Sequence, residues 1–192
     1  MSLPAKLLTE IEAILLRAVP EIVAKQTTGQ PYYAAFILYY GSDQADDRTP
    51  TLILPTESRR DRIAAQKGKT APHHIWVHDE FIGGADTVEV SIPDESLRNK
   101  CRLWYHFHES DPTVTLAAFR TMVQRVSWQL NNQAPSRLKN TTSDFVYVPG
   151  DMSHDFCDTI GDMKESIPAA RLQMLRDNRW LGVDPWYELP AE

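Results

Sequence analysis

Residues 32–40 form an apolar and aromatic run that predicts a strand in the centre of the core. These nine residues include no charge, no Gly and no Pro, while Pro31 precedes them and Gly41 follows. A short run between two such breakers is typical of a strand that is covered on both faces. A polar connection then leads to residues 51–55, which predict a second strand antiparallel to the first. We therefore expect the first run to be an interior strand that pairs on one side with the second.

Three later segments also have the pattern of strands. Residues 87–92 alternate as a half-buried strand should, and residues 144–148 form a short buried run. Residues 74–78 could form a further strand, with a turn at Gly83-Gly84 before the next one.

Helices are predicted from apolar positions that recur on one helix face. Residues 5–26 show this spacing, and Pro20 is expected to break or kink that helix because it removes a hydrogen bond. Asp94 and Glu95 open another helix, whose apolar face includes His108. We expect Asp111 to be the N-cap of the next helix, which ends near residue 130. The remaining predicted helices cover residues 57–66, 156–164 and 168–182, and residues 131–143 are predicted to be a loop.

The order of these elements predicts an α+β fold with a mostly antiparallel sheet and helices packed on it. A doubly wound sheet would need a regular alternation of strands and helices, which the pattern lacks. The 192 residues fit one domain, residues 1–192, because no linker or internal repeat divides them.

Charge and composition narrow the classes of partner. The chain is 42% hydrophobic and 24% charged, as in ordinary soluble proteins, and its net charge is -6. This charge argues against a general nucleic-acid binder, which needs clustered Lys and Arg, and it suits a basic partner. Glu10 and Glu12 interrupt what would be the apolar core of a signal peptide, and no run has the length of a membrane span. With only Cys101 and Cys157, we expect two reduced thiols in a cytoplasmic protein.

The histidines are the first candidates for chemistry. His73, His74 and His78 surround a tryptophan, and His106 and His108 lie among acidic residues. A metal site needs nitrogen and oxygen donors that converge on one point. In a helix, however, positions i and i+2 diverge by about 200°. We therefore expect structural roles here, and keep a metal-assisted hydrolase as the alternative.

Two acidic loops are the candidates for binding. The loop that follows residues 144–148 contains Asp151, His154 and Asp155, with Cys157 after it, and loops at the ends of buried strands often carry function. The loop after the first strand contains Asp43, Asp46 and Asp47, without the order of a calcium loop. We expect the two loops to be exposed and close together. The alternative for the first loop is a helix start with Asp155 as N-cap.

No motif in the chain identifies catalytic residues or a cofactor. Gly-x-Ser-x-Gly, His-Glu-x-x-His and Cys-x-x-Cys are absent, and Gly83-Gly84 lacks the surroundings of a phosphate loop. Amphipathic aromatic side chains are the more useful resource, since they anchor interfaces when exposed. Trp180, Trp186 and Tyr187 could therefore dock the end of the chain on its own domain or bind a partner.

The order of features resembles an uncharacterised bacterial family, the domain-of-unknown-function 4303 type. Three stretches of sequence carry the resemblance: Tyr32-Tyr33-Ala34-Ala35-Phe36-Ile37-Leu38-Tyr39 after a helix, Leu52-Ile53-Leu54-Pro55-Thr56, and Phe145-Val146-Tyr147-Val148 leading to Glu165-Ser166-Ile167-Pro168 and Arg179-Trp180-Leu181. The resemblance implies a small cytoplasmic α+β domain without assigned catalytic residues. Related small bacterial domains are often found beside secreted toxins, as immunity proteins.

These observations favour a non-enzymatic protein that works by binding another protein, in its specific form an immunity protein that neutralises a toxin. The expectation rests on the negative net charge, the aromatic residues and the missing catalytic motifs. The metal-assisted hydrolase remains the competing hypothesis.

Overall fold

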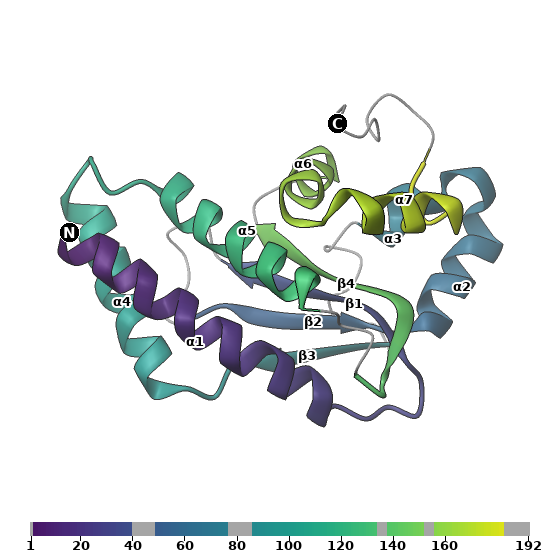
Figure 1. Cartoon of the computed structure of the whole chain (residues 1–192), viewed down its shortest axis with the longest axis horizontal. Helices are drawn as coiled ribbons and strands as arrows, with labels where there is room; N and C mark the ends of the chain where they lie inside the picture. Colours follow the sequence, from purple (N-terminus) through teal and green to yellow (C-terminus); the bar gives the residue numbers. More distant parts are fainter. Residues whose placement is uncertain (1, 40–48, 77–85, 134–137, 152–155, 183–192) are drawn as a thin grey trace.

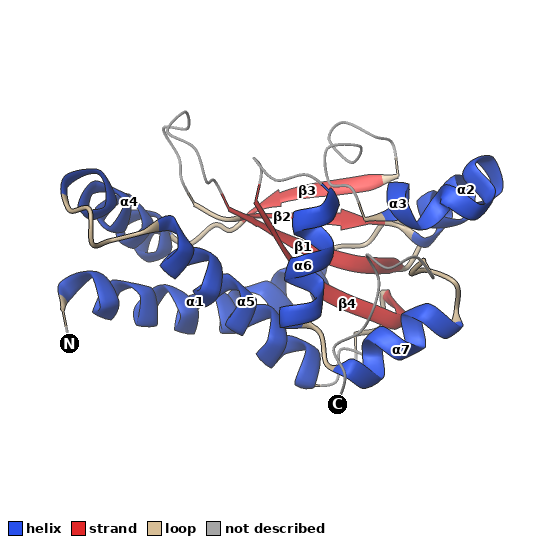
Figure 2. Ribbon diagram, turned by 90° about the horizontal axis from the view of Figure 1, so that it is seen from above, coloured by secondary structure: helices blue, strands red, loops and turns tan. Residues whose placement is uncertain are grey.

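A four-stranded sheet forms the middle of the protein, with helices on both of its faces (Figures 1 and 2). The computed structural model describes residues 2–39, 49–76, 86–133, 138–151 and 156–182, and for residues 151 and 156–159 the backbone alone. The strands are β1 (Tyr32–Tyr39), β2 (Thr51–Pro55), β3 (Thr87–Ser91) and β4 (Thr141–Asp151). The helices are α1 (Leu3–Lys25), α2 (Glu57–Lys67), α3 (Ala71–Ile75), α4 (Glu95–Ser110), α5 (Leu116–Asn132), α6 (Phe156–Ser166) and α7 (Ala169–Asp177), with a 3₁₀ turn at Gly68–Thr70.

The strands lie in the order β3-β2-β1-β4, and the interior position of β1 and its antiparallel pairing with β2 follow the sequence prediction. The strand β1 is interior, it pairs antiparallel with β2, and Ile37 lies beside Leu52. The β2 and β3 strands are also antiparallel. On its other side, β1 runs parallel to β4, with Ile37 beside Pro149. The predicted α+β class with a mostly antiparallel sheet is therefore confirmed, and it includes one parallel pair.

A β-bulge in β1 decides which of its side chains faces which layer. All eight residues of β1 are buried. From Ala34 to Tyr39 the side chains alternate between the two hydrophobic clusters, but Tyr32 belongs to the first and Tyr33 to the second, against the alternation. The register with β4 shifts between Tyr32 and Ala34, as expected where an extra residue enters a ladder. The bulge thus turns Tyr33 toward the second cluster.

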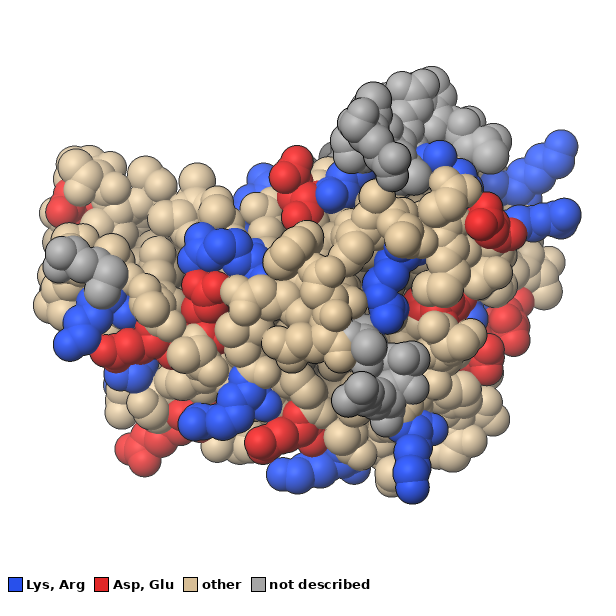
Figure 3. Space-filling model, viewed as in Figure 1, with Lys and Arg blue, Asp and Glu red and all other residues tan. Residues whose placement is uncertain are grey.

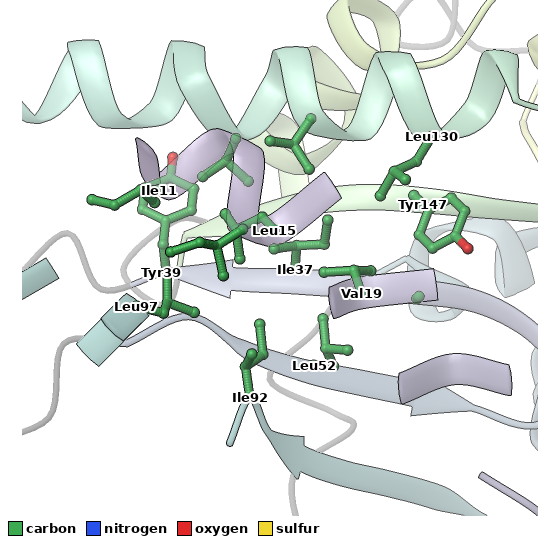
Figure 4. Packing of buried hydrophobic residues seen from close by; sticks show 14 of the residues in the cluster. Ile11, Leu15, Val19, Ile37, Tyr39, Leu52, Ile92, Leu97, Leu130 and Tyr147 are labelled. Atoms are coloured by element: carbon green, nitrogen blue, oxygen red, sulfur yellow. The ribbon is translucent and has the colours of Figure 1, made fainter. Parts of the chain in front are cut away.

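The two clusters lie on opposite faces of the sheet. The first is covered by α1, α4 and α5, and Figure 4 shows side chains of α1, among them Leu15 and Val19, beside Ile37 and Leu52 of the sheet. The second is covered by α2, α3, α6 and α7. Because β1 contributes to both clusters, burial of this strand links the two layers into one core.

The outer edge of β4 is closed by side chains instead of a further strand. Asn131, buried near the end of α5, donates from Nδ2 to the Tyr147 carbonyl at 2.8 Å and accepts from the Tyr147 amide at 2.9 Å. Arg171 of α7 donates to the Phe145 carbonyl at 2.9 Å. These groups satisfy backbone positions that would otherwise invite another strand. The sequence prediction placed Asn131 in a loop, which is wrong because this bond pattern needs the residue on the helix.

Two helix predictions need correction in the first half of the chain. The helix α1 continues through Pro20 to Lys25 without a break. Both sides of the proline are held, since Val19, Ile22 and Val23 are buried in the first cluster, and this packing outweighs one lost hydrogen bond. Residues 74–78 were expected to form a strand, but the helix α3 ends at Ile75, after a first turn that contains Pro72.

Two further corrections concern helix ends. Asp111 ends α4 instead of starting α5: its amide donates to the Phe107 carbonyl at 2.8 Å, and its carboxylate accepts from the Thr113 amide at 2.9 Å. The next helix, α5, begins only at Leu116. The last helix, α7, ends at Asp177, before the predicted residues 180–182.

Candidate functional site

The two predicted binding loops lie mostly outside the described residues. Asp43, Asp46, Asp47, His154 and Asp155 fall in the segments 40–48 and 152–155. The backbone of Asp151 ends β4 beside Tyr39, the last residue of β1. The two strands that precede the loops are thus parallel neighbours. The prediction of Asp151 as a loop residue is therefore wrong, because pairing with β1 extends β4 to this residue. The rest of the two loops stays a prediction.

The histidines fall on opposite sides of the sheet. His73 and His74 lie on α3, with ring centroids 5.3 Å apart, next to residues of the second cluster. His106 and His108 lie on α4, over the first cluster. The ring of His108 stacks on Trp104 at 5.8 Å, and its Nδ1 is 2.5 Å from the Val114 carbonyl oxygen.

These positions give no metal site in the described part of the chain, where no group of three histidine, cysteine or acidic residues could hold an ion. His78 lies outside the described residues. The metal-assisted hydrolase therefore stays a hypothesis without a structural observation in its favour.

A buried cluster around Arg60 ties the end of the described chain to α2. The guanidinium of Arg60 donates to Asp144 at 3.0 Å, and both side chains are only 4% exposed. It lies 4.1 Å from the ring centroid of Trp180 and 5.2 Å from that of Tyr33. The indole N–H of Trp76 donates to the Trp180 carbonyl at 2.7 Å. Trp180 therefore docks on its own fold, whereas Trp186 and Tyr187 lie outside the described residues.

The electrostatics of this cluster are those of a closed structural site. Burial raises the pKa of the Tyr33 phenol, whose O–H donates to the Ile75 carbonyl at 2.9 Å. Burial would also raise the pKa of Asp144, but the charge of Arg60 and the hydrogen bonds from Arg60 and Asn178 outweigh it and hold that pKa below its ordinary value. A carboxylate kept ionised and paired with Arg60 inside the protein supports the fold.

A hollow of about 630 Å³ lies between α5 and α6. Trp128 lies in its wall and is 49% exposed, which makes it an exposed large aromatic side chain. The other lining residues are polar: Thr121, Gln124, Arg125 and Gln129 of α5 and Glu165 of α6. We refer to these six residues as the Trp128 hollow. An exposed indole with a polar rim is the usual form of an interface anchor.

Position along α5 explains why Trp128 is exposed. The helix packs on the sheet through a buried stripe that includes Phe119, Val123, Val126 and Leu130. Trp128 is two residues from both Val126 and Leu130, and a step of two residues turns about 200° around a helix. Its side chain therefore points away from the core. Within the described segments, the indole has no ring contact and no hydrogen bond.

Two polar networks fix the walls of the hollow. Arg120 and Gln124 both donate to Asp162 of α6 at 2.8 Å, and the Asp162 side chain is almost fully buried. On the other side, Arg125 pairs with Glu12 of α1 at 2.7 Å and Gln129 donates to the same carboxylate at 3.1 Å. These bonds hold α5 against both neighbouring helices.

Charges of both signs are interspersed on the face that carries α1 and α5 (Figure 3). The Trp128 hollow is accordingly not part of a basic patch, because each of its nearby arginines has a carboxylate partner. Within the described segments, Glu165 has no ion pair. The hollow therefore offers one uncompensated carboxylate beside an indole.

A second hollow, of about 480 Å³, lies between α1 and α4 and includes Leu7 and Leu103. Leu103 is 41% exposed, but Lys100 in its wall is paired with Glu10. Leucine is less often an energetic anchor of interfaces than tryptophan. We therefore take the Trp128 hollow as the candidate site and use Leu103 as a comparison.

Sequence reasoning missed Trp128, although one signal was present. A tryptophan off the apolar stripe of an amphipathic helix is a candidate for an exposed anchor, and the stripe of α5 was predicted. No sequence signal indicated that Glu165 would line the same hollow as Trp128, since this depends on how α6 docks on α5.

Comparisons with known proteins add no relative: no family model, no curated protein and no solved structure matches this chain. The resemblance to the domain-of-unknown-function 4303 family therefore stays a prediction. In the described segments, no helix combines the length and the hydropathy that crossing a bilayer requires.

Proposed function

We propose that this protein acts by binding another protein through the Trp128 hollow. The observation that carries the proposal is the half-exposed indole of Trp128, set among polar side chains on a helix whose position is fixed from both sides. Tryptophan buries a large area on contact at little cost in side-chain entropy, and it is enriched among the residues that dominate binding energy.

The rigidity of the surroundings supports the same proposal. A binding anchor works best when its supporting shell holds it in place before the partner arrives. Here α5 is joined to α6 through Asp162 and to α1 through Glu12. A partner would thus meet a surface that is already ordered.

The specific form of the proposal is an immunity protein that neutralises a toxin. Its support is the resemblance given above, together with the net charge of -6, which favours encounter with a basic partner. We place the encounter in the cytoplasm, where thiols stay reduced. The Cys101 side chain is buried, and we expect its thiol to stay reduced there.

The experiment compares capture by three proteins: the wild type, Trp128→Ala and Leu103→Ala. Each is tagged and incubated with lysate of the source organism, and bound proteins are identified by mass spectrometry. We expect a protein that the wild type and Leu103→Ala retain and that Trp128→Ala loses, with melting temperatures unchanged. Leu103 is the matched control because it is an exposed apolar residue outside the hollow.

Retention of every captured protein by Trp128→Ala would contradict the proposed site. The identity of the captured protein then tests the specific form. A toxin encoded beside this gene supports an immunity protein, and a metabolic enzyme as the specific partner argues against one.

A further inference from the structure

The Trp128 hollow is electron-rich. Two arginines lie near it, but Arg120 is paired with Asp162 and Arg125 with Glu12. Their positive charges are therefore compensated inside the fold. Glu165 is exposed and, in the described part of the chain, has no cationic partner. The remaining charge on the wall of the hollow is negative.

The two glutamines add hydrogen-bond acceptors. Gln124 uses its amide nitrogen to donate to Asp162, and Gln129 uses its amide nitrogen to donate to Glu12. The amide oxygen of each side chain has no partner among the described residues. A carbonyl oxygen can only accept a hydrogen bond. A ligand that brings N–H donors and positive charge would therefore complement these oxygens and Glu165.

The buried cluster shows which group meets these requirements. There, the guanidinium of Arg60 lies 4.1 Å from the ring centroid of Trp180 and 3.0 Å from a carboxylate oxygen of Asp144. The Trp128 hollow has the indole and the carboxylate of Glu165 without a guanidinium of its own that is free to join them. A planar guanidinium stacks on an indole and offers five donors at its edge.

We infer that the Trp128 hollow receives an arginine side chain of the partner, with its guanidinium over the Trp128 ring and its N–H groups toward Glu165 and the two glutamine oxygens. The inference rests on the proposed function and names the chemistry of that partner. Lysine would satisfy the charge but offers a single nitrogen and cannot stack as a plane. Arginine is also enriched among interface anchors and pairs with anchors on the other side.

The test uses small probes and needs no knowledge of the partner. The protein is labelled with 5-fluorotryptophan, and the ¹⁹F resonance of Trp128 is assigned as the one of five that is absent from Trp128→Phe. N-acetyl-arginine amide is then titrated and compared with N-acetyl-citrulline amide, which has nearly the same shape and no charge. We expect the Trp128 resonance to shift with the arginine probe and to shift much less with the citrulline probe.

Two charge variants locate the carboxylate that matters. Glu165→Gln should weaken the arginine response by about two- to five-fold, the range of an exposed ion pair. Glu21→Gln removes the same charge from an exposed position of α1 that does not line the hollow, and it should leave the response unchanged. Equal responses to both probes, or equal effects of the two variants, would overturn the inference.

The outcomes separate this inference from the proposed function. If Trp128→Ala loses its partner while the arginine probe leaves the Trp128 resonance in place, the hollow binds a protein by other chemistry and the arginine assignment is wrong. If the probe binds as expected but Trp128→Ala keeps every partner, the hollow recognises arginine and the proposed protein interface is wrong.

Discussion

Two regions of the molecule combine a tryptophan with a carboxylate, and they differ in whether a guanidinium of the same chain lies with them. In the buried cluster, Arg60 contacts Trp180 and Asp144, and the pair it forms with Asp144 is closed to solvent. In the Trp128 hollow, the indole and Glu165 are exposed and the nearby arginines are paired elsewhere. An indole and a carboxylate thus form a closed site where a guanidinium of the same chain joins them, and an open site where none does.

This difference teaches how the fold separates stability from recognition. Arg60, Asp144 and Trp180 come from segments far apart in the chain, so their contacts join α2, β4 and the region after α7. Trp128 contributes to neither hydrophobic cluster. Removing a side chain of the first region should therefore destabilise the protein strongly, whereas removing one of the second should change stability little and act mainly on binding.

The largest effect is expected from Arg60→Ala. Removal of the guanidinium leaves Asp144 buried with its charge unbalanced, which typically costs about 3–5 kcal/mol of unfolding free energy. The matched change, Arg125→Ala, breaks a pair whose arginine is 50% exposed and should cost less than about 1 kcal/mol. Urea unfolding of both variants measures the difference. Similar losses of unfolding free energy would show that burial of the Arg60–Asp144 pair does not make it more important for stability than the exposed Arg125–Glu12 pair.

A second prediction compares the two tryptophans. Trp180→Ala removes a partly buried ring that packs on Arg60 and on the second cluster, so we expect a loss of about 2 kcal/mol. Trp128→Ala should change stability by less than about 0.5 kcal/mol, because its ring has no such contacts. Thermal unfolding of the two variants tests this, and a larger loss for Trp128→Ala would assign that residue a structural role.

Much of this architecture follows from local patterns. The apolar run that forms β1 and the period of α1, α4 and α5 placed most of the first cluster correctly. Elements fixed by distant partners were harder to predict. The short helix α3 ends where the Ile75 carbonyl accepts from Tyr33, 42 residues earlier, and no local pattern encodes that bond. Likewise, the sequence around Asn131 is typical of a polar loop, and only the contact with the edge of β4 explains its place on a helix.

The candidate site was harder to predict than the fold. Acidic loops attract attention because their residues are neighbours in sequence, and the prediction therefore favoured Asp43, Asp46, Asp47, Asp151, His154 and Asp155. The Trp128 hollow combines residues of two helices that are 37 positions apart, at Trp128 and Glu165. Only the docking of α6 on α5 through Asp162 brings them to one surface. Residue type and spacing do not predict such a meeting.

The third prediction concerns the pH dependence of the buried cluster. The pKa of Asp144 is lower in the folded protein than its ordinary value, so the stability it contributes is present above that value and is lost as the pH falls through the folded pKa. We expect the urea concentration at the unfolding midpoint of the wild type to decrease once the pH is below about 4. Asp144→Asn, which cannot titrate, should show a shallower fall. If the urea midpoints of the wild type and Asp144→Asn decrease in parallel with pH, Asp144 is not the source of the acid sensitivity.

The smallest effect is expected at the turn that places Trp180 over Arg60. The amide of Trp180 donates to the Leu175 carbonyl and that of Arg179 donates to the Arg176 carbonyl, both at 2.8 Å, which is the pattern of a Schellman motif. This motif needs a left-handed residue before Trp180, and Arg179 takes that conformation, with φ of 63°.

Glycine adopts such angles without a steric cost, so Arg179→Gly should stabilise the protein by about 0.5–1 kcal/mol. A substitution of the opposite kind is the control: the exposed Gly68, after α2, has φ of 54° and no atom within 4 Å of an added Cβ. Gly68→Ala should therefore destabilise through backbone strain alone, by about 1–3 kcal/mol, because ψ of -122° places this residue outside the left-handed helical region. Chemical unfolding measures both. A loss of stability in Arg179→Gly would mean that contacts of the arginine side chain outweigh the strain of its backbone.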